Sequence, residues 1–195
     1  MTIRTEMTRG LRNNNPLNIR HSADRWQGAR ITQTDPSFVQ FNSMAYGYRA
    51  GWKVLDAYWT HFEKERKPYN VRNIIARWAP PTENDTEAYI RAVTKLSGLG
   101  GNENMARPLR FWYLSDLERT ARLIASMACV ECGLKMDEVN MDEVWEGYDL
   151  AFPKAGRRKR IREEKEAQRA RDEYWDWSAE GLQGVSARYL DDLPG

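Results

Sequence analysis

One stretch of the chain, from Met44 to Phe62, constrains the fold more than any other. Its bulky apolar residues recur at intervals of three and four, the spacing that places side chains on one face of an α-helix. The positions are Met44, Tyr48, Trp52, Leu55, Trp59 and Phe62. The pattern predicts a long amphipathic helix whose apolar face packs into a globular core.

The segment before this helix, from Arg9 to Phe41, is irregular. It contains Asn13-Asn14-Asn15-Pro16 and Trp26-Gln27-Gly28, and runs of Asn, Pro and Gly interrupt helices and form turns. The pieces between these turns are long enough only for short strands. We therefore expect loops and a small β-hairpin in this segment.

Three further helices are expected after residue 70. A short helix covers residues 71–78 and is stopped by Pro80-Pro81, because proline lacks the backbone N–H of a helix interior. Capping-box patterns, in which Asn or Ser is followed three residues later by Glu, open helices over 84–98 and 115–133. The sequence thus predicts a mainly α fold with a small β-hairpin (α+β), in a domain of residues 1–133.

Residues 134–195 differ in composition from this predicted domain. Residues 136–152 are acidic but keep apolar residues for packing, and residues 157–171 are almost entirely Lys, Arg, Glu, Gln and Ala. Mixed charge suits a solvated helix stabilised by ion pairs. Because glutamates follow the basic run 157–160 at once, this charged helical tail does not indicate nucleic-acid binding. The aromatic residues from Tyr174 onward are typical of docking onto a partner protein.

Composition excludes a membrane-spanning protein. The chain has 195 residues, of which 41% are hydrophobic, and its apolar runs are far shorter than the stretch of about 20 residues that crosses a bilayer. Its first residues form no apolar signal stretch. We therefore expect synthesis in the cytoplasm without a signal peptide.

Charge is distributed unevenly along the chain. Residues 1–133 hold 19 Lys and Arg against 13 Asp and Glu, a net charge of +6, whereas residues 134–195 hold 11 against 15, a net charge of −4. A positive domain favours an anionic partner, and cell-wall polymers, nucleic acid and membrane surfaces all qualify. The sign of the charge therefore selects none of them.

The two cysteines, Cys129 and Cys132, form a C-x-x-C pair. Zinc takes four ligands, and the two histidines, His21 and His61, lie in distant segments. The pair falls at a predicted helix C-terminus, where the helix dipole does not favour a thiolate. We interpret the cysteines as two buried apolar side chains, and we expect no metal and no cofactor.

Carboxylates beside aromatic and amide side chains are the remaining chemistry, a composition typical of a sugar-cleaving groove. Cleavage needs a protonated carboxylic acid in an apolar site and often an ionised carboxylate opposite it. Glu83 is the leading candidate acid because it follows the apolar residues 78–81, although it equally suits a first-turn acid that stabilises the next helix. Asp35 is the candidate second carboxylate, against an ordinary Asp-Pro turn, and Glu6 ranks third.

Four residues are candidates for placing the sugars. Asn14 and Asn15 carry donors and acceptors that suit sugar hydroxyls and amides, although Asn clusters also form caps and turns. Trp26 and Trp78 offer aromatic faces on which sugar rings stack, although most tryptophans lie in cores. Both interpretations stay open for each residue.

Two strings of the sequence resemble a known family. Residues 9–20 and 74–90, together with Trp26-Gln27-Gly28, are similar to phage and prophage proteins usually described as virion structural proteins. The resemblance covers about residues 9–133 and not the rest of the chain. It implies a phage product that is virion-associated or released to the cell wall at lysis.

The same order of motifs is more distantly similar to the autolysin and flagellar N-acetylglucosaminidases, which have a lysozyme-like fold. In those enzymes an Asn-Asn motif is followed by a hairpin with an acidic residue and by a later tyrosine. The corresponding residues here are Asn14 and Asn15, Asp35, and Tyr89. This resemblance implies a lysozyme-like domain whose groove binds peptidoglycan, with Tyr89 beside the substrate.

The chain departs from those enzymes in its expected general acid. Their principal acid is a Glu in a helix before the Asn pair, whereas the twelve residues before Asn13 show no helix pattern. Either Glu6 or Glu83 takes its place, or the domain keeps the fold without catalysis. We therefore expect a phage-derived protein that cleaves peptidoglycan glycan strands, as a muramidase, glucosaminidase or lytic transglycosylase. The alternative is a non-catalytic virion structural protein that docks on other virion proteins through residues 134–195.

Overall fold

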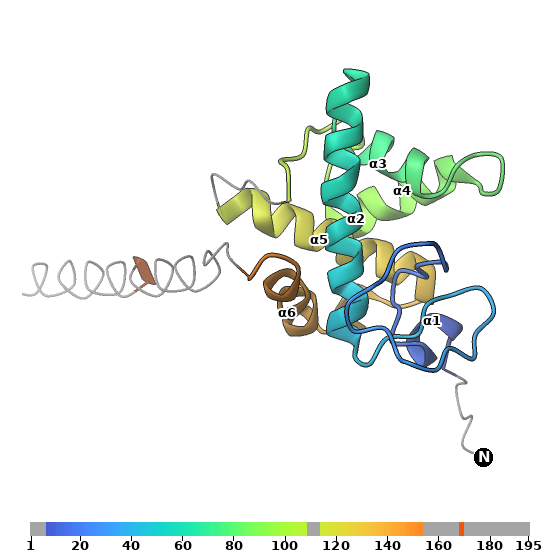
Figure 1. The fold of residues 1–195 in the computed structure, drawn as a ribbon. Helices are drawn as coiled ribbons and strands as arrows, with labels where there is room; N and C mark the ends of the chain where they lie inside the picture. The colour runs from blue at the N-terminus through green and yellow to red at the C-terminus, as the bar shows by residue number, and fades with distance from the viewer. Residues whose placement is uncertain (1–6, 109–113, 154–167, 170–195) are drawn as a thin grey trace, which may run out of the picture. The chain divides into compact units, whose positions relative to one another are not determined.

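Helices carry most of the regular structure in the part of the chain that is described. The structure, a computed structural model, describes residues 7–108, 114–153 and 168–169. The helices are α1 (Arg9–Arg12), α2 (Met44–Glu65), α3 (Val71–Trp78), α4 (Thr86–Ser97), α5 (Leu114–Cys132), a 3₁₀ turn (Met136–Glu138) and α6 (Met141–Ala151) (Figure 1). The chain forms two compact units, Met1–Lys154 and Ala155–Gly195, and helices α1 to α6 all belong to the first.

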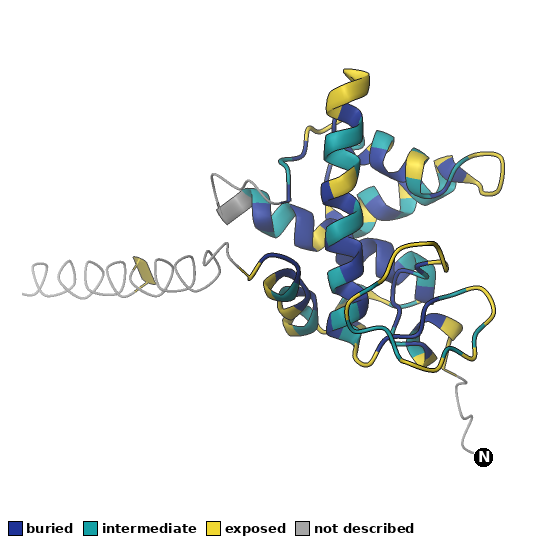
Figure 2. Ribbon diagram, in the orientation of Figure 1, coloured by how far each residue is buried: buried dark blue, intermediate teal, exposed yellow. Residues whose placement is uncertain are grey.

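The long helix α2 lies at the centre of this unit and confirms the helix predicted from residue 44 onward. Tyr48, Trp52 and Leu55 on its apolar face are fully buried. In Figure 1, α6 lies beside the first half of α2, and α5 crosses behind it. Burial concentrates where these three helices meet, whereas the last three residues of α2, 63–65, are exposed (Figure 2).

Helix α6 packs closely on α2 and belongs to the same compact unit. The Trp52 indole N–H donates to the carbonyl of Val144 at 2.9 Å, and the Trp52 and Tyr148 rings meet edge to face with centroids 5.1 Å apart. A Cβ added at Gly147 would lie 2.7 Å from Cβ of Tyr48, so only glycine permits this approach of the helices. The acidic segment expected at 136–152 thus forms a helix of the core, and the compact unit continues past residue 133 to Lys154.

The other predicted helices are also present. Helix α3 spans residues 71–78, and its N-cap Asn70 accepts a hydrogen bond from the backbone N–H of Asn73 at 2.9 Å. Helix α4 is capped by Asp85 and not by the expected Asn84, because the Asp85 carboxylate accepts from the N–H of Ala88 at 2.9 Å. Helix α4 ends at Gly98, whose φ of 70° is left-handed. Helix α5 matches the helix expected over residues 115–133.

The small β-hairpin expected between Arg9 and Phe41 does not form. In the described residues of this segment, the chain makes only single antiparallel bridges, Arg20 with Phe38 and Ala29 with Phe41. The fold is therefore helical with irregular loops, and the α+β expectation is wrong at this point.

Side-chain hydrogen bonds take the place of the backbone hydrogen bonds that would join the two strands of a hairpin. The carboxamide oxygen of Gln40 accepts from the backbone N–H of Thr34 at 2.6 Å, and Gln33 accepts from the N–H of Gln40 at 2.6 Å. Asn15 accepts from the N–H of Ile19 and donates to the carbonyl of Val39, at 2.8 Å each. Because amide side chains satisfy backbone groups that a hairpin would pair across strands, the segment stays ordered without becoming a sheet.

Two further expectations concern the cysteines and the tail. Cys129 and Cys132 are both buried and free, and burial raises the pKa of the Cys132 thiol to about 11, as suits apolar packing residues.

None of the described helices has the length and apolar character to cross a bilayer. The expected charged helix at 157–171 lies outside the described residues apart from Gln168 and Arg169, and the aromatic tail lies wholly outside them.

Candidate functional site

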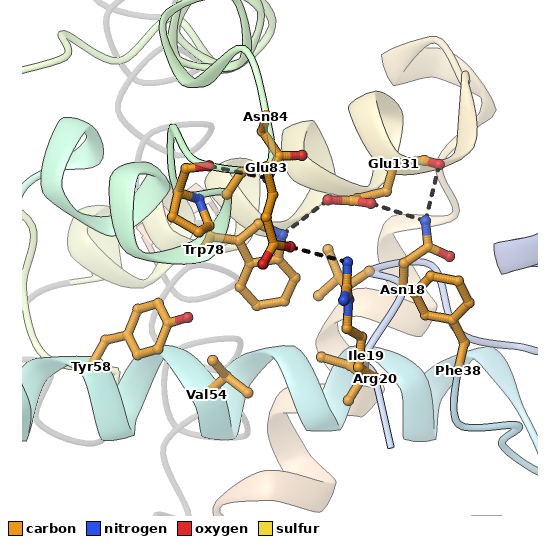
Figure 3. Close-up of a pocket in the computed structure, with 13 residues that line it drawn as sticks. Asn18, Ile19, Arg20, Phe38, Val54, Tyr58, Trp78, Glu83, Asn84 and Glu131 are labelled. Carbon is orange, nitrogen blue, oxygen red and sulfur yellow. Dashed lines mark hydrogen bonds and ion pairs between the residues drawn. The ribbon is translucent and has the colours of Figure 1, made fainter. Parts of the chain in front are cut away.

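A pocket of about 310 Å³ opens between the N-terminal segment, α2 and the loop that joins α3 to α4. Residues 17–20 and Phe38 form one wall, and Val54 and Tyr58 of α2 lie beneath. Residues between Trp78 and Asn84 form the other wall, and Glu131 from the end of α5 closes the inner side (Figure 3). The volume suits a small ligand or one part of a longer one.

Glu131 is the best-anchored polar group in this pocket. Its Oε1 accepts from the indole N–H of Trp78 at 2.9 Å and from the hydroxyl of Tyr89 at 2.8 Å. Its Oε2 accepts from the side-chain amide of Asn18 at 2.9 Å. These donors come from α3, α4 and the N-terminal segment, so one carboxylate joins four parts of the chain. Burial and the neighbouring Glu131 carboxylate raise the pKa of Tyr89 well above its ordinary value.

Glu83 lies on the loop before α4 and lines the same pocket, and its function as an acid stays a prediction. Its side chain is 59% exposed, and one oxygen lies 3.4 Å from a guanidinium nitrogen of Arg20, which is 73% exposed. Figure 3 shows this pair joining the two walls. An exposed ion pair of this kind contributes little stability. These surroundings lack the apolar enclosure that a general acid requires.

Asp35 organises the irregular N-terminal segment. It accepts from Arg9 Nε at 2.7 Å and from the Asn13 amide at 2.7 Å, and it also accepts from the backbone N–H groups of Ser37 and Phe38 at 3.0 Å each. The described lining of the pocket does not include it. These contacts give Asp35 a structural function in the loop, and a catalytic role stays a prediction.

The residues predicted to place sugars fall into two groups. Trp78 lines the pocket, and Trp78 and Tyr89 meet at Glu131. Asn14, Asn15 and Trp26 are not part of the described lining. Asn14 donates to the carbonyl of Phe41 at 3.1 Å and has a left-handed φ of 51°, whereas Trp26 is half-buried. Glu6 lies outside the described residues.

Sequence reasoning missed Glu131 and Asn18 as residues of the site. Glu131 stands inside the Cys129-to-Cys132 motif, where the two thiols form the more specific local pattern. Its partners Asn18, Trp78 and Tyr89 are separated from it by 113, 53 and 42 positions. A charged residue in the last turn, after the mainly apolar run from Leu123 to Val130, is the one local signal that could have indicated a site.

Comparison with known proteins shows that the chain is related to a phage protein. Over 150 residues the chain is 36% identical to Protein P5 of Pseudoalteromonas phage PM2, and the alignment covers 75% of this chain and 84% of that protein. The chain belongs to the Protein P5 family. No protein-family model matches the sequence.

Membership of the Protein P5 family supports the phage origin that the sequence strings implied. The finer parts of that expectation, a lysozyme-like domain and the cleavage of glycan, stay predictions. Among residues 7–108, 114–153 and 168–169, no group of three or more His, Cys, Asp or Glu side chains could hold a metal ion.

Replacing Asp35 by Asn is expected to lower the thermal midpoint at neutral pH and to flatten its dependence on acid. Hydrogen bonds from Arg9 hold the pKa of Asp35 well below its ordinary value. A carboxylate with a depressed pKa stabilises the fold above its unfolded-state pKa of about 4, and this contribution is lost as the pH falls toward the folded-state pKa.

Thermal unfolding of the wild type and Asp35→Asn, followed by circular dichroism between about pH 6 and pH 2.5, measures this coupling. The difference between the two midpoints should shrink steadily toward the acid end. Two curves that stay parallel over this range would show that Asp35 does not carry the loop's acid sensitivity.

Proposed function

We propose that the protein is a component of a phage virion whose pocket binds bacterial cell-wall glycan without cleaving it. The observation that carries this proposal is the pocket itself, where Trp78, Tyr58 and Phe38 lie beside Asn18, Asn84 and two carboxylates. Aromatic faces with a few fixed polar groups are the usual composition of a small-molecule site.

The phage side of the proposal rests on the relationship to Protein P5 of phage PM2. It agrees with the resemblance of residues 9–20 and 74–90 to virion structural proteins. Other virion proteins are then the natural partners. Because α6 is part of the compact unit, we assign docking to residues 155–195, whose sequence is highly charged and then rich in aromatic residues.

The proposal that the pocket binds glycan without cleaving it rests on the hydrogen bonds and the exposure of its two carboxyl groups. Both oxygens of Glu131 already accept hydrogen bonds from the protein, and Glu83 is exposed beside Arg20. A glycosidase of the expected type needs a carboxylic acid enclosed by apolar side chains. Glu83 is exposed and Glu131 is held by three hydrogen-bond donors, so neither has these surroundings, which favours recognition over cleavage.

A second candidate function is the cleavage of glycan strands, and one observation favours it. Glu83 and Glu131 line the same pocket, and glycoside cleavage commonly uses two carboxyl groups. In this version Glu83 is the general acid and Glu131, in place of Asp35, is the facing carboxylate.

Two measurements on the purified full-length chain test these functions. We expect the protein to sediment with insoluble peptidoglycan and to leave the turbidity of a peptidoglycan suspension unchanged. A protein that stays in the supernatant contradicts the binding proposal. A falling turbidity that is abolished in Glu83→Gln, but not in the control Glu87→Gln on α4, establishes the second candidate instead.

The virion assignment has its own test. Mass spectrometry of purified particles of the phage that carries this chain should detect its peptides at a fixed ratio to the major coat protein. Peptides found only in the lysate and not in the particles would overturn this part of the proposal.

A further inference from the structure

Glu131 is a pocket residue whose carboxylate is held by several hydrogen bonds from the protein. These bonds do not use all of its acceptor positions. A carboxylate offers about four acceptor positions on its two oxygens. Trp78 and Tyr89 occupy Oε1, and Asn18 occupies one position on Oε2. Among the residues that the structure describes, these are the side-chain donors to Glu131, which leaves one acceptor position on Oε2, and Glu131 is part of the pocket lining.

We infer that Glu131 is the specificity-determining residue of the pocket and accepts a hydrogen bond from an O–H or N–H group of a sugar. This inference rests on the proposed binding of glycan and names the chemistry that selects the ligand. The donor is either a hydroxyl or the amide N–H of an N-acetylated sugar, and the two sources share the same contact with Oε2.

The side chains around Glu131 also favour an uncharged sugar as the ligand. The indole N–H of Trp78 and the hydroxyl of Tyr89 already donate to Glu131, so neither hydrogen is left for a ligand. Trp78 therefore offers its ring, which suits the apolar face of a sugar. With Glu83 and Glu131 set against Arg20, the carboxylates outnumber the guanidinium in the lining, which disfavours anionic ligands.

Three anchoring donors also make Glu131 a pre-organised acceptor. A side chain already fixed by the protein loses little further freedom when the ligand binds. An acceptor that carries charge forms a stronger hydrogen bond than a neutral one. Removing this acceptor should therefore weaken binding by about ten-fold or more, since hydrogen bonds to charged groups contribute roughly 1.5–3 kcal/mol.

The variant Glu131→Gln removes the free acceptor position. The hydrogen bonds with Trp78, Tyr89 and Asn18 can still form in this variant. The remaining carbonyl oxygen of the glutamine still accepts from Trp78 and Tyr89. Its new amide faces Asn18, whose own Oδ1 is buried and has no hydrogen-bond partner in the described part of the chain. A rotation of the Asn18 amide lets that oxygen accept from the glutamine, so the fold is kept while the ligand meets a donor.

Calorimetric titration with chitotriose and with cellotriose tests the inference on the full chain. Wild-type protein should bind chitotriose, and Glu131→Gln should bind it about ten-fold or more weakly. The control Glu87→Gln, an exposed carboxylate of α4 paired with Arg72, should bind as the wild type does. Equal affinity of the wild type for both sugars identifies a hydroxyl as the donor, and a preference for chitotriose identifies the acetamido N–H.

A second measurement keeps the inference testable if Glu131→Gln does not fold. The side-chain carboxyl ¹³C resonance of Glu131 in the wild type should move on addition of chitotriose. Unchanged affinity in a folded Glu131→Gln, or a carboxyl resonance that does not move while chitotriose binds, overturns the inference alone. Failure of the wild type to bind either sugar overturns the proposed function and the inference together.

Discussion

A chain that ends at residue 133 is expected not to fold, whereas a chain that ends at Lys154 is expected to unfold at the same temperature as the full-length protein. Helix α6 covers Tyr48 and Trp52, which are fully buried in the intact unit, and Val144 accepts the hydrogen bond of the Trp52 indole. Each aromatic side chain buries about 150–250 Å², which stabilises a fold by roughly 4–6 kcal/mol. Uncovering two of them removes an amount comparable to the whole stability of a domain, about 5–15 kcal/mol.

The two truncations control for each other, because both remove residues 155–195 and only one removes α6. Circular dichroism and calorimetry on the pair measure the effect. A cooperative transition in the chain that ends at residue 133 would show that the predicted boundary at that residue is a true domain boundary. Loss of the transition in both would show that residues 155–195 support the first unit.

Replacing Asn15 by Ala is expected to destabilise the fold by roughly 3 kcal/mol, because buried polar groups left without a partner cost about 1–3 kcal/mol each. The Asn15 side chain is fully buried. It donates to the carbonyls of Ile19 and Val39 and accepts from the N–H of Ile19. It therefore replaces part of the ladder of a hairpin, and its loss leaves backbone groups unpaired inside the protein.

Urea denaturation of Asn15→Ala measures this cost, with Asn102→Ala, a change at an exposed loop residue, as the control. The control should stay within about 0.5 kcal/mol of the wild type. If Asn15→Ala kept its stability and lost affinity for chitotriose, the interpretation of Asn15 as a sugar ligand would be right and its structural role wrong.

The helices were predictable because their signals are local. The spacing of Tyr48, Trp52 and Leu55 fixes one face of α2 without reference to any other segment, and prolines 80 and 81 end α3 by their own chemistry. Helix α6 shows the limit of this reasoning. The sequence of residues 136–152 indicated apolar residues for packing, but the contact of Gly147 with α2 depends on a distant partner.

The loops and the site were harder to predict because their contacts are distant in sequence. Nothing near Gln40 indicates that its amide pairs with Asn13, 27 positions away, at 3.0 Å. Amide side chains bind the backbone groups that two strands would otherwise pair, and for this reason the prediction of a hairpin was wrong. Glu131 was missed for the same reason, since its partners reach it from three other parts of the chain. The proximity of Glu83 and Trp78 was predictable because Trp78 ends α3 and Glu83 lies in the short loop that follows. Their function in the site stays a prediction.

Resonance mapping of the tryptophan side chains tests the central claim, that the pocket beside Trp78 binds cell-wall glycan. In protein labelled with ¹⁵N at tryptophan, the indole N–H signal of Trp78 is assigned by its absence from Trp78→Phe. On titration with chitotriose this signal should shift saturably, while that of Trp52, buried between α2 and α6, should not. A Trp78 signal that stays fixed up to millimolar sugar would contradict the account.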